Sequence, residues 1–394
     1  MKTVLIISYS PLHRDPRVLR QIQALKHDYK IITIGYTSVN NDAIVHYLLN
    51  RPNNGSFVHK MYKLMCGLLR KFNNYTERTL EMMLDLKNIL SKDILKPDVI
   101  IANDWHALYL SSALKSKYNW VVKIYFDVHE YWLNDDNSNS IKGRLLIRPI
   151  ITEVLKKCKS DINCMTTVCD GIAREYEKFF GFSEGFVSVI TNAPEYNDNL
   201  KPKAVEGDII KLIHHGGAVK KRKLELMIEM MRYLDPDKYE LTFMLVKIDH
   251  KHYHKYYDYL VKKSKMYKNI KFIEPVNFRE ITSTLNGYDM GVYILSPENF
   301  NYKNALPNKL FEFVQARLAI AIGPSVEMAK IVNKYGLGVC ANNFSPKSLA
   351  DSISQITPSK ILDYKKNSEK YARELSAEVN ITKIRDIVAE LTKE

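Results

Sequence analysis

The sequence contains no hydrophobic run long enough to cross a membrane. Its longest apolar stretches, such as residues 4–7 and 317–322, are far shorter than the ~20 residues that a membrane-spanning helix requires. The N-terminus also lacks the apolar segment with a small-residue cleavage site that marks a secretory signal peptide. We therefore expect a cytoplasmic protein, either free or bound peripherally at the inner face of the plasma membrane.

Cysteine is scarce, and two common motifs are missing. The five cysteines among 394 residues include no Cys-x-x-Cys pair, which excludes a disulfide framework and a zinc site of that kind. No Gly-x-Gly-x-x-Gly follows the first apolar segment, residues 3–8, so a dinucleotide-binding enzyme loses its main marker. We expect neither a bound metal nor a cofactor.

The sequence has an excess of positive charge. The formal net charge is +14 and the pI about 9.2, which suits phosphorylated ligands, anionic lipid or nucleic acid, and which solvated lysines also explain. Because no recognition-helix, zinc-finger or RNP-like pattern accompanies the charge, we do not expect a nucleic-acid partner.

Short runs rich in Val, Ile and Tyr alternate with segments of helical period, which predicts α/β domains with parallel sheets. Strands are predicted over residues 3–8, 29–34, 98–102, 121–127, 164–168, 187–191, 211–215, 240–246, 270–273, 290–295, 318–322 and 338–340. The expected organisation is an N-terminal domain over 1–195, a linker over 196–208, a second domain over 209–375 and a C-terminal helix over 376–394. The C-terminal helix can pack back on the N-terminal domain.

The segment 305–312 (Ala-Leu-Pro-Asn-Lys-Leu-Phe-Glu) predicts the start of a helix. Pro307 suits an early position and Asn308 can cap. The amino end of such a helix offers unpaired N–H groups and a positive dipole to a phosphate, while Glu312 lies about one turn inside and can accept hydrogen bonds from ribose. An ordinary capped helix with an exposed glutamate is the alternative.

The loop 214–223 (His-His-Gly-Gly-Ala-Val-Lys-Lys-Arg-Lys) joins a predicted strand to a predicted helix. Its glycines let the backbone approach a phosphate, and its cations can neutralise a diphosphate. A solvated basic turn is the alternative interpretation.

In the first half, Asp127 and His129 follow an apolar strand, where a period of two directs both to the same side. Arg14 and Arg17 suit contacts to a phosphate or acceptor and internal salt bridges equally well. Asp104, in Asn-Asp-Trp-His at 103–106, suits a helix cap better than a catalytic role.

Six segments in chain order, covering nearly the whole chain, resemble the glycosyltransferase family 4 group of enzymes: residues 14–18, 103–106, 127–130, 191–194, 214–223 and 305–312. The resemblance implies the GT-B fold, in which two Rossmann-like doubly wound domains face a central cleft. It also implies a retaining, metal-independent transferase that uses a UDP- or GDP-linked sugar as donor.

The resemblance further implies roles for individual residues. Catalytic roles fall to His129 beside the donor sugar, to Arg222 at the phosphate and to Glu312. Donor binding falls to Gly217, Lys221, Arg222, Asn304, Leu306, Pro307, Asn308, Lys309 and Glu312, and the acceptor side to Arg14, Arg17, Asp104 and Glu130. Where the family usually carries a second glutamate, this chain has the neutral Asn304.

The expected acceptor is a glycan or a lipid-linked saccharide of bacterial surface polysaccharide synthesis. Residues 57–69 and 141–159 mix basic and apolar side chains, which predicts either helices on anionic lipid or ordinary core-facing helices with a solvated basic side. Two other functions stay open: a catalytically weak nucleotide-sugar-binding subunit, which Asn304 favours, and a GT-B epimerase, for which the matched segments supply no carboxylate pair.

Overall fold

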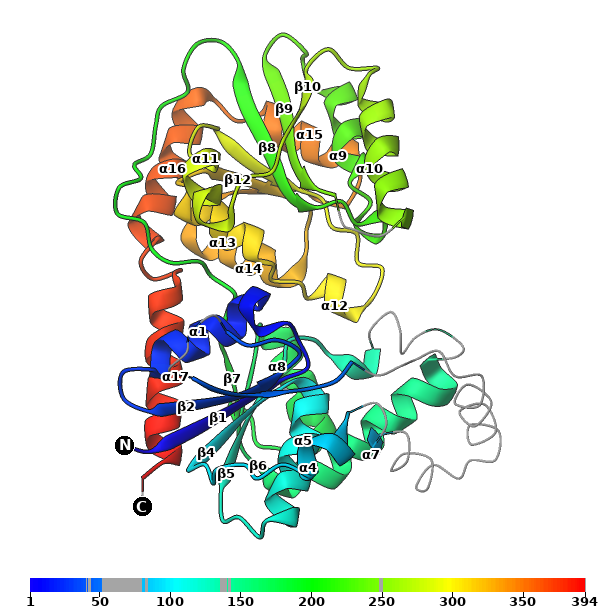
Figure 1. Cartoon of the computed structure of the whole chain (residues 1–394). Helices are drawn as coiled ribbons and strands as arrows, with labels where there is room; N and C mark the ends of the chain where they lie inside the picture. Colours follow the sequence, from blue (N-terminus) through cyan, green and yellow to red (C-terminus); the bar gives the residue numbers. More distant parts are fainter. Residues whose placement is uncertain are drawn as a thin grey trace. The chain divides into compact units, whose positions relative to one another are not determined.

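The computed structural model describes residues 1–39, 41, 44–51, 80–81, 84–134, 140, 143–247 and 251–393, and the chain divides into two compact units (Figure 1). The first unit comprises Met1–Thr191 and Asn380–Glu394, and the second comprises Asn192–Val379. Residues 196–208, where the linker is expected, belong to the second unit. Each unit is built around one parallel sheet.

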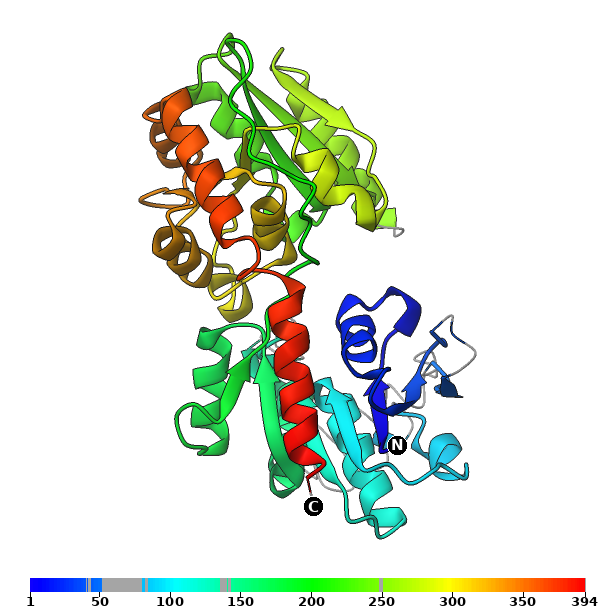
Figure 2. The same ribbon diagram turned by 90° about the vertical axis from the view of Figure 1, so that its left-hand side faces the viewer.

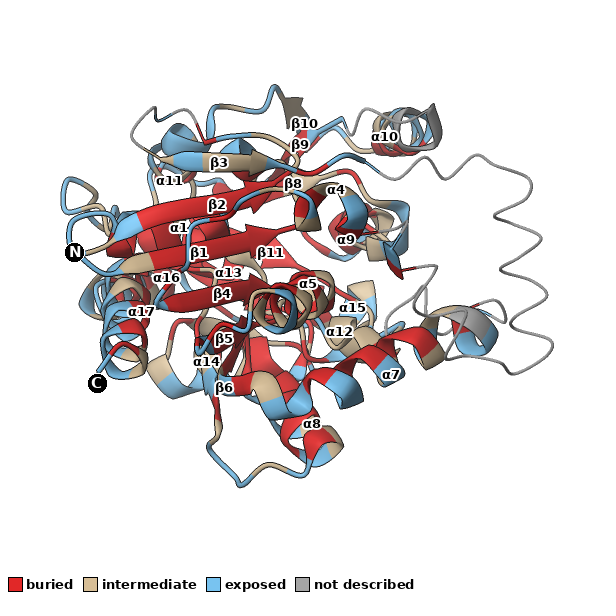
Figure 3. Ribbon diagram, turned by 60° about the horizontal axis from the view of Figure 1, so that its bottom comes forward, coloured by how far each residue is buried: buried red, intermediate tan, exposed pale blue. Residues whose placement is uncertain are grey.

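The sheet of the first unit has seven strands in the order β3-β2-β1-β4-β5-β6-β7, and every pairing is parallel. The strands are β1 (Thr3–Ser8), β2 (Lys30–Gly35), β3 (Val45–Leu48), β4 (Val99–Asn103), β5 (Lys123–Asp127), β6 (Ile162–Thr167) and β7 (Val187–Val189). Its described helices are η1 (Leu12–Arg14), α1 (Pro16–Leu25), α4 (Leu86–Leu90), α5 (Asp104–Lys117), η2 (Trp132–Asn134), η3 (Gly143–Ile147), α7 (Arg148–Cys158), η4 (Lys159–Asp161) and α8 (Asp170–Phe180). Figure 3 shows the central strands as buried.

The sheet of the second unit has six strands in the order β10-β9-β8-β11-β12-β13, again all parallel. They are β8 (Ile210–Gly217), β9 (Tyr239–Val246), β10 (Ile270–Ile273), β11 (Met290–Tyr293), β12 (Ala319–Ile322) and β13 (Gly338–Cys340). The described helices are η5 (Lys220–Arg222), α9 (Glu225–Met230), η6 (Met231–Tyr233), α10 (Lys251–Ser264), η7 (Phe278–Glu280), α11 (Ile281–Leu285), α12 (Phe300–Lys303), α13 (Asn308–Gln315), α14 (Val326–Tyr335), α15 (Pro346–Ser354) and α16 (Pro358–Tyr371). The prediction of two parallel-sheet α/β domains is confirmed.

All twelve predicted strands form, and β3 is an additional one. Residues Val45–Leu48 form an edge strand whose side chains are exposed or half-buried. Such a strand needs no continuous apolar run, so its sequence carries little signal.

Helix α13 begins differently from the prediction. Asn308 is its first residue rather than its cap, and Pro307 occupies the cap position without a side-chain cap. On the opposite side, Phe313 lies directly over Gly291 of β11, where a Cβ atom would come within 2.4 Å of the ring. The glycine therefore lets α13 approach the sheet closely, which fixes the height of the helix above the strands.

The last helix, α17 (Ala377–Leu391), begins in the second unit and continues into the first (Figure 2). Ile384 and Val388 join the hydrophobic core formed by β1, β2, β4 and α1. Arg385 donates from Nε to the carbonyl of Ala24 over 2.7 Å. The residues of α17 from Asn380 onward are thus part of the first unit's core.

Of the two basic amphipathic segments, residues 57–69 lie outside the described residues, as do residues 141–142 of the second. Within the second segment, α7 buries its apolar side chains Ile150, Ile151, Val154 and Leu155. Lys156 and Lys157 are exposed. For α7 the structure favours a core-facing helix with a solvated basic side. No helix of the described chain is long and apolar enough to cross a membrane.

Replacing Ile384 with alanine should lower the unfolding free energy of the first unit by about 2 to 5 kcal/mol, because it opens a cavity in a closed core. All three tryptophans, Trp105, Trp120 and Trp132, belong to this unit, so denaturant titration followed by their fluorescence reports its unfolding. The matched control is Glu390→Ala on the exposed side of α17, which should leave the midpoint unchanged. An equal loss in both variants would contradict a core role for Ile384.

Candidate functional site

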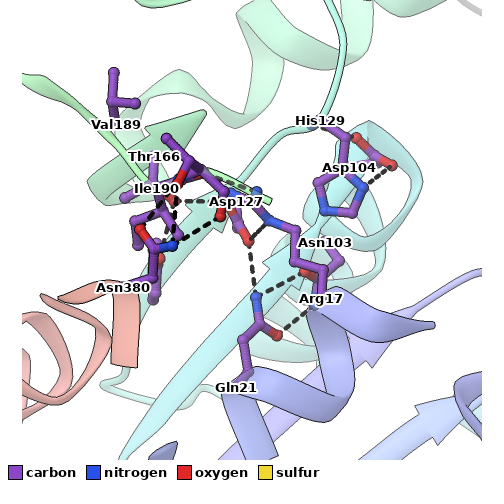
Figure 4. Close-up of polar contacts among 12 residues, drawn as sticks. Arg17, Gln21, Asn103, Asp104, Asp127, His129, Thr166, Val189, Ile190 and Asn380 are labelled. Atoms are coloured by element: carbon purple, nitrogen blue, oxygen red, sulfur yellow. Dashed lines mark hydrogen bonds and ion pairs between the residues drawn. The ribbon is translucent and has the colours of Figure 1, made fainter. Parts of the chain in front are cut away.

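The carboxyl ends of the first unit's strands carry a buried polar network around Asp127 (Figure 4). Arg17 of α1 binds the carboxylate through Nε, 2.5 Å from Oδ2, and through Nη2. Thr166 donates to it over 2.6 Å and Gln21 over 2.8 Å. Arg17 also donates to the carbonyl of Ile190 over 3.0 Å. Asp127 thus accepts hydrogen bonds from three side chains, which fix its carboxylate in place.

The pair of Arg17 and Asp127 is ionised and satisfied internally. Burial raises the pKa of Asp127, but the charge and hydrogen bonds of Arg17, together with His129 and Thr166, lower it overall. Burial likewise lowers the pKa of Arg17, and the charge and hydrogen bonds of Asp127, together with Tyr125 and Asp104, raise it overall. Of the two interpretations of Arg17, the structure favours the internal salt bridge, which corrects its assignment to the acceptor side. Arg14 is exposed at the end of η1.

His129 pairs with Asp104 and lies close enough to Asp127 to lower the pKa of that carboxyl. Strand β5 ends at Asp127, so the strand alternation that was used to place His129 does not extend to it. The backbone N–H of His129 donates to Asp104 Oδ1 over 3.1 Å, and its Nδ1 lies 3.7 Å from Oδ2. Trp132 Nε1 donates to the same Oδ1 over 3.0 Å. Asp104 therefore fixes the turn at 129–132; the cap position of α5 is Asn103.

One ring nitrogen of His129 has no hydrogen-bond partner among the described residues. Its Nε2 is buried and makes no hydrogen bond to any described residue. A hydroxyl in contact with this atom would meet a nitrogen whose ring is held in place through Asp104. Glu130, the next residue, is exposed, and its carbonyl accepts a hydrogen bond from the Tyr176 hydroxyl over 2.8 Å.

A group of aromatic side chains lies beside the turn at 129–132, and the sequence analysis did not predict it. His106 stacks on Trp105 with ring centres 3.7 Å apart and meets Tyr9 at 5.5 Å and Trp132 at 6.1 Å. Burial lowers the pKa of His106 to about 4, so the ring is neutral near pH 7. The sequence signal for this group was the Trp-His pair directly after a strand. Because Tyr9 and Trp132 lie far from this pair in the sequence, they could not be assigned to the same group.

In the second unit, the carboxyl end of β8 carries the predicted glycine and basic residues. Gly216 has a φ of +117°, a conformation that side chains rarely adopt. Gly217 ends β8, and Lys221 and Arg222 follow in η5. Lys221 is exposed, whereas Arg222 is half-buried and lies close enough to lower the pKa of Lys309. The segment thus contains both cations and a glycine whose backbone conformation disfavours any other residue.

Lys309 and His214 form a buried pair at the first turn of α13. Lys309 Nζ lies 3.1 Å from His214 Nε2 and 4.0 Å from the ring centre of Tyr293. Burial is the main cause that lowers the pKa of Lys309 well below its ordinary value, followed by Arg222. Burial and Lys309 in turn lower the pKa of His214.

Glu312 lies one turn further along α13, beside His215. Its Oε2 is 3.3 Å from His215 Nε2, and both residues are buried. Burial raises the pKa of Glu312 to about 7 against the opposing effect of Lys309, and burial with Lys309 lowers that of His215 to about 3. The two histidines of β8 were not given roles from the sequence, although their position before the double glycine was the available signal.

The remaining predicted donor-side residues surround the start of α13. Leu306 is buried, and Pro307 and Asn308 are half-buried. Asn304 is buried and caps α12 by donating from Nδ2 to the carbonyl of Phe300 over 3.0 Å. The structure thus brings His214, His215, Gly216, Arg222, Lys309 and Glu312 together in one unit. A set of this composition suits a ligand with a diphosphate and neighbouring hydroxyl groups.

Removing the arginine of the first unit's network should be costly. Arg17→Met leaves Asp127 buried without its counter-ion and should lower the unfolding free energy by about 3 to 5 kcal/mol. Adding Asp127→Asn should recover part of this loss, because the uncompensated charge is gone. Tryptophan fluorescence during denaturant unfolding measures both. If Arg17→Met is as stable as the wild-type protein, the ion pair of Arg17 and Asp127 does not stabilise the first unit.

Comparisons with known proteins agree with this architecture. The family described as starch synthase catalytic domain matches residues 2–139, about a third of the chain. No curated protein sequence matches.

Solved structures match over both units. A glycosyltransferase from Rickettsia africae is 13% identical with a TM-score of 0.66, covering 100% of this chain and 99% of that one. The sucrose-phosphate synthase from Thermosynechococcus elongatus is 12% identical with a TM-score of 0.72, covering 99% of each chain. An Anabaena protein in complex with UDP and glucose is 12% identical with a TM-score of 0.67, covering 99% of each. The chain therefore has the GT-B fold of glycosyltransferases, in agreement with the family 4 resemblance.

Proposed function

We propose that this chain is a glycosyltransferase that binds a nucleotide-diphosphate sugar at the carboxyl end of β8 in the second unit. The observation that carries the proposal is that Lys309 at the start of α13 lies beside Gly216 at the end of β8 and within the electrostatic reach of Arg222. Open α/β sheets bind ligands at the carboxyl ends of their strands, and this end is positively charged.

The start of α13 supplies the phosphate contacts. The first N–H groups of a helix have no partner within the helix, and no side chain caps α13. Their dipole and the charge of Arg222 both favour an anion at this point. Because Gly216 has no side chain, a phosphate can come close to its backbone.

Glu312 is our candidate for the ribose. Its carboxylate is held by α13 and lies beside His215. A buried carboxylate that accepts hydrogen bonds from two adjacent hydroxyls gains charge-assisted bonds that a neutral side chain cannot supply. This role supports a nucleotide, either UDP- or GDP-linked, over inorganic diphosphate alone.

We expect transfer with retention of the anomeric configuration and without a metal ion. The bond from the anomeric carbon to the diphosphate oxygen breaks, and a bond to the acceptor oxygen forms on the same face. The proton of the acceptor hydroxyl passes to the leaving diphosphate, whose charge Arg222 and the start of α13 stabilise. His129 of the first unit, with its unpaired Nε2, is our candidate to hold a hydroxyl of the transferred sugar.

The proposed acceptor is a glycan or a lipid-linked saccharide, with bacterial surface polysaccharide synthesis as the setting. Contact with an anionic membrane surface stays a prediction, because α7 packs its apolar side chains in the core and its exposed Lys156 is explained by solvation. The similarity to a sucrose-phosphate synthase makes free sugar phosphates a second acceptor class to test.

Incubating the protein with a panel of UDP- and GDP-linked sugars should release a nucleoside diphosphate, and an acceptor should raise the rate. The acceptor arms are a bacterial lipid extract, soluble glycans and sugar phosphates. Binding without release in any arm would favour a binding subunit, and conversion of the donor sugar without transfer would favour an epimerase. An NMR spectrum of product made in excess chelator tests retention and metal independence together.

Replacing Arg222 with methionine should weaken binding of a nucleoside diphosphate by about 1.5 to 3 kcal/mol, because a charge-assisted contact to phosphate is lost. Affinity for the nucleoside alone should not change. Calorimetry with both ligands measures this, and Lys238→Met, an exposed cation elsewhere in the unit, is the matched control. If both affinities fall equally, Arg222 supports the loop rather than the phosphate.

A further inference from the structure

Lys309 is a buried amine that forms no ion pair with a described carboxylate. Only 6% of the residue is exposed, and its Nζ contacts His214 Nε2 and the face of the Tyr293 ring. No described carboxylate forms an ion pair with it. Because a buried charge without a counter-ion is costly, the empty site favours the neutral amine.

The hydrogen bonds of His214 decide where an additional proton in this pair can lie. His214 Nδ1 is 2.8 Å from the carbonyl of Val292, which only accepts, so Nδ1 carries the hydrogen. Nε2 then accepts from Lys309. With one proton added to the pair, a single hydrogen lies between Nε2 and Nζ, and the amine, with an ordinary pKa of ~10.4 against ~6.5 for imidazole, is the stronger base. A proton gained by the pair therefore lies on Lys309 Nζ.

Groups from four elements face Lys309. They are His214 and His215 on β8, Arg222 in η5, Tyr293 on β11 and Glu312 on α13. Burial and the charge of Arg222 lower the pKa of Lys309, and Glu312 opposes them without reversing the shift. Both histidines are neutral near pH 7, since their own pKa values are lowered.

Gly216 leaves one side of Lys309 uncovered. A Cβ atom at this position would lie 3.5 Å from Nζ, so a side chain there would cover the amine. A phosphate oxygen near the Gly216 backbone would instead bring negative charge to Nζ. The missing counter-ion of Lys309 is therefore supplied by the ligand.

We propose that Lys309 takes up one proton from solvent when the diphosphate of the donor binds, and returns it when the nucleoside diphosphate leaves. The proposal rests on the proposed function, since it needs a diphosphate beside Gly216. It makes donor affinity depend on pH through one buried amine.

The direction of the pH dependence follows from the two states. A bound diphosphate raises the pKa of Lys309 above its value in the empty protein. Below the lower of these values Lys309 is charged already, and above the higher value it stays neutral. Between them each binding event carries a proton, and affinity falls about tenfold for each unit rise in pH.

The test is calorimetric titration of the full chain with UDP and with GDP at about pH 8, in two buffers of different ionisation enthalpy. At this pH an ordinary lysine is charged, an ordinary histidine is neutral, and the terminal phosphate, with a pKa near ~6, is fully ionised. Proton exchange by the ligand itself is therefore small. The difference between the buffers should correspond to uptake of about one proton per ligand bound.

Two variants identify the group that takes up the proton. Lys309→Met should bind the nucleoside diphosphate more weakly and take up no proton. Glu312→Gln should retain the uptake, although Glu312, with a pKa of about 7, is the rival acceptor. Uptake that is lost in Glu312→Gln and kept in Lys309→Met would overturn the assignment.

The wild-type measurement alone can overturn the proposal, so a variant that fails to fold does not protect it. Binding of UDP or GDP with identical heats in the two buffers would contradict proton uptake and leave the donor site standing. No binding of either nucleoside diphosphate would contradict the proposed function and the proton uptake together. Uptake that vanishes only in Lys309→Met supports both.

Discussion

The carboxyl ends of parallel strands lie at the same end of their sheet, and the buried polar groups there need hydrogen-bond or ionic partners. In the first unit the requirement is met internally, because Arg17 and Asp127 neutralise each other. In the second unit the corresponding edge carries Lys309 and Arg222, and neither forms an ion pair with a described carboxylate. Both arginines follow the first strand of their unit, β1 or β8. The same topology therefore yields a closed network in one unit and, in the other, a positive site at Arg222 that no described carboxylate neutralises.

The positive site depends on how firmly α13 is held. Phe313 rests on Gly291, and the neighbouring Leu310 and Val314 are buried, so the helix has one fixed height over the sheet. Lys309 and Glu312 are three residues apart and therefore share a face of this helix. Their separation is set by the helix rather than by the ligand. A site of this kind keeps its geometry when empty and adjusts its charge by protonation instead.

Strand positions were predictable because buried parallel strands are nearly continuous apolar runs, whereas the half-exposed Val45–Leu48 carries no such run. Candidate residues that share one segment, such as Glu312 and Lys309, could be placed together from the sequence. This was not possible where partners lie far apart in sequence: Arg17 fits a turn salt bridge or a ligand equally well until Asp127 is found beside it. His214 illustrates the same limit, since nothing local connects it with Lys309.

The charges of the second unit also bear on what the site recognises. In the proposed function its cations and the start of α13 would contact a diphosphate and Glu312 the hydroxyls beside it, and these contacts would be common to every nucleotide sugar. The position that would add a second carboxylate is Asn304, whose Nδ2 caps α12. A neutral amide there leaves the site more positive than two glutamates would. Recognition in this unit is therefore weighted toward the diphosphate, and selection among sugars must depend on uncharged contacts elsewhere.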